Sequence, residues 1–437
     1  MFMTSKLKET YQRFPQSFWI ITLASFIDSI GTFMILPFIY IFMSWNFGLS
    51  MVEVGFVYII LGIGNILGGI VGGSLSDKVG RKKCALFGLL VSGMYSLTFV
   101  FLSSAKLVYL LVGIMGFLGS IGKPARQAMF ADILTVEKRP EGFSILRIVA
   151  NLAATIGPAL GGLLSSYNFK WLFIGDAITS FITAIIFVIK IPETHPIKKE
   201  IRKISSKVPS VADEKNRSKS GHGRVFKNWR YLLFIIVSAL VSLTYMQVTS
   251  TLSIFLLENL SFSEQQFGLL ISMNALIVVV IQFWLTKKIK MFPALIMMAV
   301  GSALYGIGFG MYGFITTIPL AFIAMIVITV GEMIAEPFNQ TVTANFAPEN
   351  ERGRYNAVYM VLEMVVMLIG PIGAGYIMDS LDRRILWYLG ASLTFIAAFG
   401  YIILYFVTKD YFVQMKNDQK SNDDLNCESI AETDVLA

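Results

Sequence analysis

Carboxylates stand inside segments of this sequence that otherwise avoid charge. Glu332 and Glu336 lie four residues apart in the stretch TVGEMIAEP, within an otherwise apolar run from Pro319 to about Phe346. This spacing places both side chains on one face of a helix, one turn apart. Two carboxylates at that separation in a medium of low dielectric constant cannot both ionise at low cost. A carboxyl that keeps its proton near neutral pH and faces the two sides of a barrier in turn can carry protons, and this pair is predicted to do so.

Other ionisable side chains stand in apolar segments, where each costs about 2.5–3.5 kcal/mol on insertion scales. Asp28, in FIDSIGTFMILP, and Glu363 are further candidates for proton coupling, and Asp28 is also a possible contact for a cationic substrate. Structural alternatives stay open. Arg147 can serve as a fixed counter-ion for a carboxylate, and Glu336 can serve packing or gating. Asp176 is expected to be a helix-end group within reach of water.

The segments that hold these residues are long and apolar. Of the 437 residues 55% are hydrophobic and 15% are charged, and the mean hydropathy is +0.67; soluble domains average about 25% charged residues. Apolar runs of about twenty residues are typical of membrane-spanning helices and are too continuous for a membrane β-barrel. We expect an all-α membrane protein with twelve spans, the first of them retained rather than cleaved as a leader. The expected spans are 17–43, 51–74, 84–104, 107–133, 142–165, 170–190, 231–257, 264–285, 293–313, 318–346, 354–379 and 384–408.

The net charge of +8 reflects membrane topology rather than nucleic-acid binding. If both termini are cytoplasmic, most of the 36 Lys and Arg residues fall in cytoplasmic segments, and by the positive-inside rule this bias sets the orientation. We therefore expect a multi-pass protein of the plasma membrane with both termini in the cytoplasm. The basic residues in the expected outer loops are Lys106, Lys170, Arg383 and Arg384.

Cysteine and histidine are too few and too far apart to build a site. Cys84 and Cys427 lie near opposite ends of the chain, so a disulfide framework is not expected. His195 and His222 both fall in the central polar segment, and no metal site follows from them. Because no nucleotide-binding loop or nucleophile–base pair stands out either, we expect no enzyme activity, no cofactor and no metal.

The chain divides into two similar halves. Residues 191–230 are polar and basic, and they read as a cytoplasmic linker between a six-helix bundle at 1–190 and a second bundle at 231–408. The tail at 409–437 is polar and is expected to be disordered in the cytoplasm. The halves match at one constant offset, without a gap, and such a duplication is typical of secondary transporters with substrate bound between the repeats. The matched pairs are Pro124 with Pro337, Gln127 with Gln340, Ala131 with Ala344, Arg139 with Arg352, Gly157-Pro158 with Gly370-Pro371, Gly162 with Gly375, Ser50 with Ser263, and Gly55 with Gly268.

A loop between the second and third expected spans reads GGSLSDKVGRKK, from Gly72 to Lys83. From its residue types alone it is a basic inner loop with a turn at Gly80 and a close helix packing at Gly73. Its spacing also resembles the signature loop G-x-L-A-D-R-x-G-R-K of the major facilitator superfamily. The resemblance covers nearly the whole chain, because twelve spans, a central basic loop and a two-fold repeat also belong to that family. The matching residues are Gly73, Leu75, Asp77, Gly80, Arg81 and Lys82.

The resemblance implies two pseudo-symmetric six-helix bundles and a latch that stabilises the outward-facing state. In that latch Asp77 caps the start of the eleventh span near Gly353 and Arg354, and Asp132 pairs with Arg81. The corresponding loop of the second half, TKKIKM, lacks the motif, so the latch is one-sided.

The fifth span carries ANLAATIGPALGGLL, which resembles the antiporter motif G-x-x-x-G-P-x-x-G-G of the same family. Ala153 replaces the first glycine, and ordinary close packing of membrane helices is the alternative explanation. The fourth span has no arginine in its first half, where exporters of this type often carry one for proton coupling. The motif therefore favours export, whereas coupling through that arginine is in doubt. The matching residues are Gly157, Pro158, Gly161 and Gly162.

These features together predict a proton-coupled antiporter of the drug-exporter type. It would move small amphipathic or cationic compounds by alternating access, with protons and the lipid bilayer as its other partners, and act as a monomer. One alternative is a transporter of a small metabolite such as a sugar or an amino acid. Another is a membrane receptor or sensor that has lost transport, although the embedded carboxylates argue against it.

Overall fold

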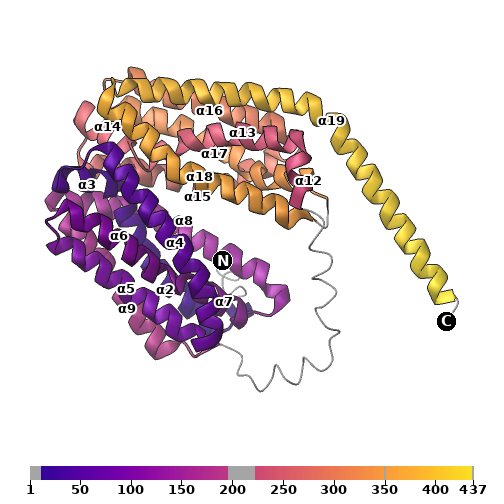
Figure 1. Ribbon diagram of the computed structural model, residues 1–437, viewed down its shortest axis with the longest axis horizontal. Coiled ribbons are helices and arrows are strands. Elements are labelled where there is room, and N and C mark those ends of the chain that lie inside the picture. Colours follow the sequence, from indigo (N-terminus) through magenta and orange to yellow (C-terminus); the bar gives the residue numbers. More distant parts are fainter. Residues whose placement is uncertain (1–10, 195–221, 349–350, 436–437) are drawn as a thin grey trace, which may run out of the picture.

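The computed structural model describes residues 11–194, 222–348 and 351–435, and every regular element within these ranges is a helix (Figure 1). In a bilayer a helix satisfies its backbone groups within one segment, which a lipid-exposed open sheet cannot do. Twelve helical segments are long and apolar enough to cross a membrane. The prediction of an all-α protein with twelve spans is confirmed.

The first half holds six of these spans, two of which are interrupted. The first span bends at Pro37, whose missing N–H group breaks the helical ladder. The fourth span breaks at Ile121, so that Pro124 falls in the first turn of α7, where a helix tolerates proline. The helices are α2 (Gln16–Ile35), η1 (Leu36–Phe38), α3 (Ile39–Phe47), α4 (Met51–Val79), α5 (Arg81–Phe101), α6 (Ala105–Ser120), α7 (Gly122–Ile133), η2 (Val136–Lys138), α8 (Arg139–Tyr167) and α9 (Lys170–Lys190).

The second half repeats this plan with differences. Pro337, the repeat counterpart of Pro124, lies inside an unbroken helix, α17. The helices are α12 (His222–Lys227), α13 (Trp229–Tyr245), η3 (Met246–Val248), α14 (Leu252–Asn259), α15 (Glu264–Ile289), α16 (Ala294–Phe314), α17 (Ile318–Phe346), α18 (Arg352–Ser380) and α19 (Arg384–Val435).

The C-terminal segment differs from its prediction. Residues from Lys409 onward were expected to be disordered, whereas α19 continues as a helix to Val435 and extends away from the bundle (Figure 1). A helix that the membrane span has already nucleated propagates at little further cost, even through polar residues.

The two halves contact each other at one end of the molecule. We call the end with the turn at Gly80 the loop end, and the opposite end, where α4 begins at Met51, the far end. Near the far end α4 crosses α18 so closely that a Cβ atom on Gly55 would lie 2.9 Å from the side chain of Ile372. A Cβ atom on Gly375 would lie 2.6 Å from the backbone of Met51. Glycine is what allows these two backbones to approach.

A second crossing, between α15 and α8, repeats the first. A Cβ atom on Gly268 would lie 2.3 Å from the carbonyl oxygen of Pro158, and one on Gly162 would lie 2.6 Å from that of Glu264. The glycines of the two crossings are repeat counterparts, because they match at the constant offset between the halves. The halves are therefore joined by two equivalent contacts, as a pseudo-two-fold repeat requires.

At the loop end the same helices are apart. A Cβ atom on Gly73 of α4, or on Gly353 of α18, would meet no other atom within 4 Å. The Asp77 side chain is 68% exposed. Figure 1 shows the two halves in contact near α3 and α14 and diverging toward α7 and α12. The structure is a conformation closed at the far end and open at the loop end.

Two adjacent glycines of α4 give a matched test of the packing inside the first half. A Cβ atom on Gly68 would lie 2.0 Å from the carbonyl oxygen of Phe117 on α6, whereas one on Gly69 would meet nothing within 4 Å. Gly68→Ala should lower the free energy of unfolding by about 1–3 kcal/mol through overpacking. Gly69→Ala should leave it unchanged or raise it by up to about 1 kcal/mol through helix propensity. Thermal unfolding in detergent measures both, and equal melting temperatures would contradict the α4–α6 contact.

Candidate functional site

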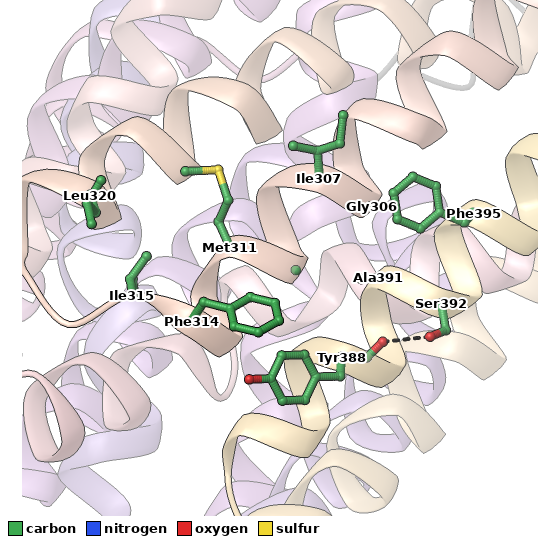
Figure 2. A pocket seen from close by; sticks show the side chains of 11 residues that line it. Gly306, Ile307, Met311, Phe314, Ile315, Leu320, Tyr388, Ala391, Ser392 and Phe395 are labelled. Atoms are coloured by element: carbon green, nitrogen blue, oxygen red, sulfur yellow. Dashed lines mark hydrogen bonds between the residues drawn. The ribbon is translucent and has the colours of Figure 1, made fainter.

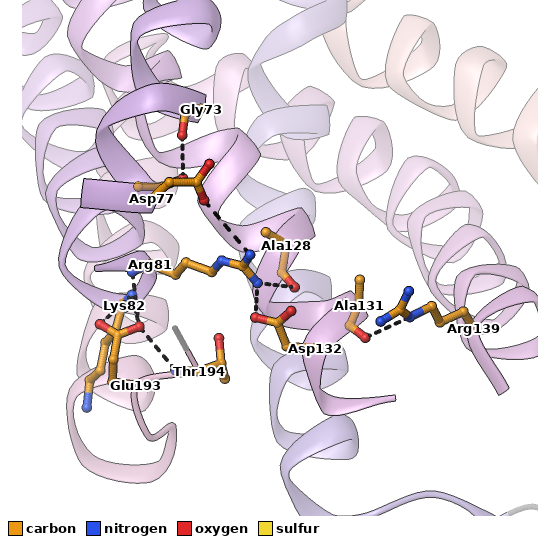
Figure 3. A network of polar contacts seen from close by, with 11 residues as sticks. Gly73, Asp77, Arg81, Lys82, Ala128, Ala131, Asp132, Arg139, Glu193 and Thr194 are labelled. Carbon is orange, nitrogen blue, oxygen red and sulfur yellow. Dashed lines mark hydrogen bonds and ion pairs between the residues drawn. The ribbon is translucent and has the colours of Figure 1, made fainter. Parts of the chain in front are cut away.

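The loop between α4 and α5 is held by a network of polar contacts (Figure 3). Gly80 has a φ of 113°, a conformation that residues with a side chain rarely adopt, so this turn requires glycine. The Arg81 guanidinium forms an ion pair with Asp132 at the end of α7 and donates to the carbonyl oxygen of Ala128 at 3.4 Å. It also lies 3.9 Å from the carboxylate of Asp77. The structure brings Arg81 and Asp132 together as the family resemblance implied.

Sequence analysis missed Glu193, which follows α9 and completes this network. Its carboxylate accepts from the backbone N–H groups of Arg81 at 3.0 Å and Lys82 at 3.1 Å. An anion at this position satisfies free amides at the start of α5 and opposes the positive end of its dipole. Lys82 also donates to the carbonyl oxygen of Val188 at 2.9 Å. The only signal in the sequence was an acidic residue among basic ones, just after the sixth span.

Two expectations for the signature loop differ from this conformation. Asp77 does not cap α18, because its exposed side chain faces Arg81 and the region of Gly353 stands apart. Gly73 was expected to allow close packing, whereas the close approach is made by its neighbour Gly72, whose added Cβ atom would lie 2.3 Å from the carbonyl oxygen of Ile121. Leu75 is half-buried and packs against the hydrophobic cluster of the first half at the loop end.

The glycine-rich motif of α8 lies where three helices meet. A Cβ atom on Gly157 would lie 2.7 Å from the side chain of Phe33, and one on Gly161 would lie 2.4 Å from the carbonyl oxygen of Met34, both on α2. Gly162 and Pro158 face α15 of the other half, as described above. The motif thus joins the first span to α8 and both to the second half.

Glu332 lies at the centre of a polar cluster in the second half. Its carboxylate accepts from the side-chain amide of Asn274 on α15 at 3.1 Å, and Tyr245 of α13 lies close by. The same amide of Asn274 donates to Thr329 at 2.9 Å, one turn before Glu332 on α17. The ring of Tyr245 lies 5.7 Å from that of the buried Tyr305. Aromatic rings and neutral hydrogen-bond donors therefore surround this carboxyl.

Glu336 lies one turn closer to the loop end and has different surroundings. It is exposed and accepts from the side-chain amide of Asn339 at 2.8 Å. Glu363 of α18 and Arg147 of α8 are charged groups within electrostatic reach of it. Glu363 in turn accepts from the Ser242 hydroxyl at 2.8 Å. Helices α13, α17 and α18 thus supply the carboxylates and the hydroxyl and amide donors of this region.

The predicted site residues of the second half therefore form one cluster. Within the described ranges no salt bridge involves Glu332, Glu336 or Glu363. Arg147 of the first half is exposed and lies within electrostatic reach of Glu336. Carboxyls with neutral partners in a membrane interior can take up and release a proton without breaking an ion pair.

Asp28 has a different environment from these glutamates. Its carboxylate pairs with the Arg126 guanidinium of α7 at 2.5 Å and accepts from the Ser180 hydroxyl at 3.4 Å. Lys123, one turn before Arg126, is a second cation within electrostatic reach. Sequence analysis placed Arg126 near the inner end of the fourth span and did not foresee the pair. Asp28 therefore has a cationic partner, whereas the glutamates of the second half have neutral ones.

The expectation for Asp176 is wrong. It was assigned to a helix end in reach of water, but its side chain is buried, at 6% exposure. It accepts from the Ser96 hydroxyl of α5 and lies against Gly31 of α2, whose added Cβ atom would be 2.6 Å from its Oδ1. A helix packed on each side, with a hydroxyl supplied by one of them, excludes water from this carboxyl.

A pocket of about 590 Å³ lies away from all these charges (Figure 2). It is bounded mainly by α16 and α19, with apolar side chains such as Met311, Phe314 and Phe395. The Tyr388 hydroxyl beside it donates to the carbonyl oxygen of Gly313 at 2.7 Å. With its polar group already satisfied and no charged residue in its wall, this pocket suits an apolar chain rather than the chemistry of the carboxylate cluster.

Curated relatives align with most of the chain. A "Na(+), Li(+), K(+)/H(+) antiporter" of Planococcus maritimus is 26% identical, over 78% of this chain and 84% of the relative. "Uncharacterized MFS-type transporter YhjO" of Bacillus subtilis (strain 168) is 28% identical, over 74% and 79%. "Multidrug resistance protein MdtH" of Salmonella paratyphi B (strain ATCC BAA-1250 / SPB7) is 24% identical, over 80% and 83%.

Solved structures and a family model agree with the fold. The chain superposes on a POT family transporter in complex with 5-aminolevulinic acid with a TM-score of 0.71 and 16% identity, over 90% of this chain and 96% of the other. The nucleoside transporter NupG gives a TM-score of 0.71 with 14% identity, over 90% and 99%. The family model of the Major Facilitator Superfamily matches residues 21–371. With its twelve helices in two repeated bundles, the chain belongs to the Major Facilitator Superfamily.

Proposed function

We propose that this transporter is a proton-coupled antiporter that exports small amphipathic or cationic compounds by alternating access. The loop end faces the cytoplasm in this proposal, because the basic residues gather there. The conformation closed at the far end is then the inward-facing one. The glycine motif of α8 and the relative named as a multidrug resistance protein both support export.

The observation that carries the proposal is the cluster of Glu332, Glu336 and Glu363. These carboxyls sit at membrane depth without a salt bridge in the described part of the chain, whereas Asp28 is paired with Arg126. Protons and a cationic substrate can therefore compete for the same negative charge in the cluster. Arg147, on the facing surface of the other half, can repel a cation and promote its release once the halves close around it.

A second candidate is exchange of an alkali cation for a proton. The relative with a cation/proton antiporter name supports it, as does a cluster of three carboxylates with amide and hydroxyl neighbours. Hard cations prefer such oxygen ligands. In this reading Asn274 and Ser242, which bond Glu332 and Glu363, orient the ligands for the ion.

Both candidates are tested in one preparation of inverted membrane vesicles with an imposed pH gradient. Uptake of cationic dyes supports drug export, and loss of the proton gradient on addition of Na⁺, Li⁺ or K⁺ supports cation exchange. A sugar or amino-acid panel tests the metabolite alternative. If the protein transports none of these substrates into the vesicles and no proton flux is seen, the proposal is contradicted and a sensor is favoured.

Replacing Glu332 tests the proton carrier. Glu332→Gln keeps the size and the hydrogen bond to Asn274 but cannot release a proton. Transport driven by a pH gradient should fall to background, while exchange of labelled for unlabelled substrate without a gradient should persist. Asn339→Ala is the matched control, because it removes a neutral partner of Glu336 and leaves every carboxyl. Normal gradient-driven transport in the glutamine variant would exclude Glu332 as the carrier.

Replacing Glu336 should change the pH dependence more than the rate. Glu336→Gln removes a negative charge beside Glu332 and Glu363, so each of them releases its proton more easily. The pH optimum of transport should shift to lower pH, by less than about two pH units, with a smaller loss of rate than in Glu332→Gln. Transport rates measured across pH in vesicles give the shift. An unchanged optimum would show that Glu336 is not coupled to the carrier.

The signature loop gives a third prediction. In the proposed outward-facing state Asp77 caps the start of α18, which is open in the present conformation. Asp77→Asn should slow transport at least severalfold and leave expression and membrane insertion intact, because the side chain is exposed and lies 3.9 Å from Arg81. Asp132→Asn, which breaks the Arg81 ion pair inside the first half, should instead lower thermal stability. If Asp77→Asn transports at the wild-type rate, the loop serves only as a signal for membrane topology.

A further inference from the structure

The start of α4 is capped by residues of both halves. The N-cap residue Ser50 and Glu53 form a capping box, in which Ser50 N–H donates to Glu53 at 2.8 Å and Glu53 N–H donates to the Ser50 hydroxyl at 3.3 Å. The two amides between them donate to one carboxylate of α18. Met51 N–H bonds Oδ1 of Asp379 at 3.1 Å, and Val52 N–H bonds Oδ2 at 3.0 Å.

This arrangement satisfies four successive amides at the positive end of a 29-residue helix. Two of these amides are satisfied by the capping box, and the other two only by Asp379 of the opposite half. A bidentate contact between a carboxylate and backbone N–H groups is a charge-assisted hydrogen bond, stronger than a neutral one. The cap is therefore complete only while the far end is closed.

The repeat supplies an internal comparison. The second crossing has the same capping box, Ser263 with Gln266, and the same close glycine, Gly162 in place of Gly375. The repeat counterpart of Asp379 is Ser166, which donates to the carbonyl oxygen of Leu163 in its own helix at 2.8 Å. One crossing thus holds a carboxylate between the halves and the other does not.

We propose that Asp379 is a gating residue of the transport cycle, whose carboxylate holds the far end closed by capping α4. Opening the far end separates α18 from α4 and leaves the amides of Met51 and Val52 to water. The exposed position of Asp379 lets water take over the carboxylate as the contact breaks. Asp379 thereby sets how often the closed far end opens.

The proposed latch of Asp77 makes this gate one of a pair. Asp77, at the C-terminal end of α4, would cap the start of α18 in the outward-facing state, and Asp379, at the C-terminal end of α18, caps the start of α4 in the present one. Each helix then carries the anion that caps the other, and the two caps alternate. This reciprocity rests on the proposed function, whereas the contact of Asp379 does not.

The test measures the far end directly, without transport. In a background of Cys84→Ser and Cys427→Ser, spin labels on Lys106→Cys and Arg384→Cys report the separation of the two halves at exposed far-end positions. Asp379→Ala should increase the population with a long distance about tenfold, and Asp379→Asn, which retains one acceptor oxygen, should increase it less. Ser166→Ala is the matched control and should leave the distribution unchanged.

A second pair of variants removes the donor instead of the acceptor. Met51→Pro deletes one capped N–H at the first position of α4, where proline is favoured, and should also raise the long-distance population. Glu264→Pro makes the same change at the start of α15, where no carboxylate faces it, and should not. If Asp379→Ala and Met51→Pro both keep the distance distribution of the parent protein, the proposed gate is wrong. A shift in distance without any proton-driven transport would uphold the gate and contradict the proposed function.

Discussion

At their two crossings the halves meet at glycines, which let one helix backbone approach another. Lipid offers no hydrophobic drive for helices to associate, so close backbone packing has to supply the contact. Gly55 and Gly375 do this for α4 and α18, and Gly162 and Gly268 do it for α8 and α15. Side chains add to these contacts near the far end, where Phe38 of the first half packs against Phe267 of the second in one buried cluster. At the loop end the halves are apart, and the core of each half stays packed there. The carboxylate cluster is then reachable from that end.

The polar groups divide unequally between the halves. In the first half Asp28 has a cationic partner, Arg126, whereas the buried Asp176 accepts from the neutral Ser96 hydroxyl. In the second half Glu332 accepts from the amide of Asn274, and Glu363 accepts from the hydroxyl of Ser242. The repeat therefore does not extend to these side chains, because the ion pair of Asp28 has no counterpart at Glu332 or Glu363 in the described part of the chain.

Much of the fold was predictable, because span length, the polar linker and the constant offset between the halves are all properties of the sequence. The glycines of the two crossings were matched as repeat counterparts, Gly55 with Gly268 and Gly162 with Gly375, but the sequence did not show that they join the halves. The Asp28–Arg126 pair was not predictable, because it depends on the rotation of α2 against α7 and on the break at Ile121. The burial of Asp176 depends in the same way on Ser96, a residue of no distinctive pattern. Contacts between helices follow from packing angles that one sequence does not display.

The unpaired glutamates have a consequence for the energetics of the empty carrier. A cluster that has lost its protons keeps net negative charge inside the membrane, and reorientation of the halves moves that charge within the transmembrane electric field. Each elementary charge that crosses the full field contributes about 2.3 kcal/mol per 100 mV. Asp28, neutralised by Arg126, adds nothing to this term. In the proposed function, the voltage across the membrane would therefore act on the glutamates of the second half, as a bias on which side the unloaded carrier faces.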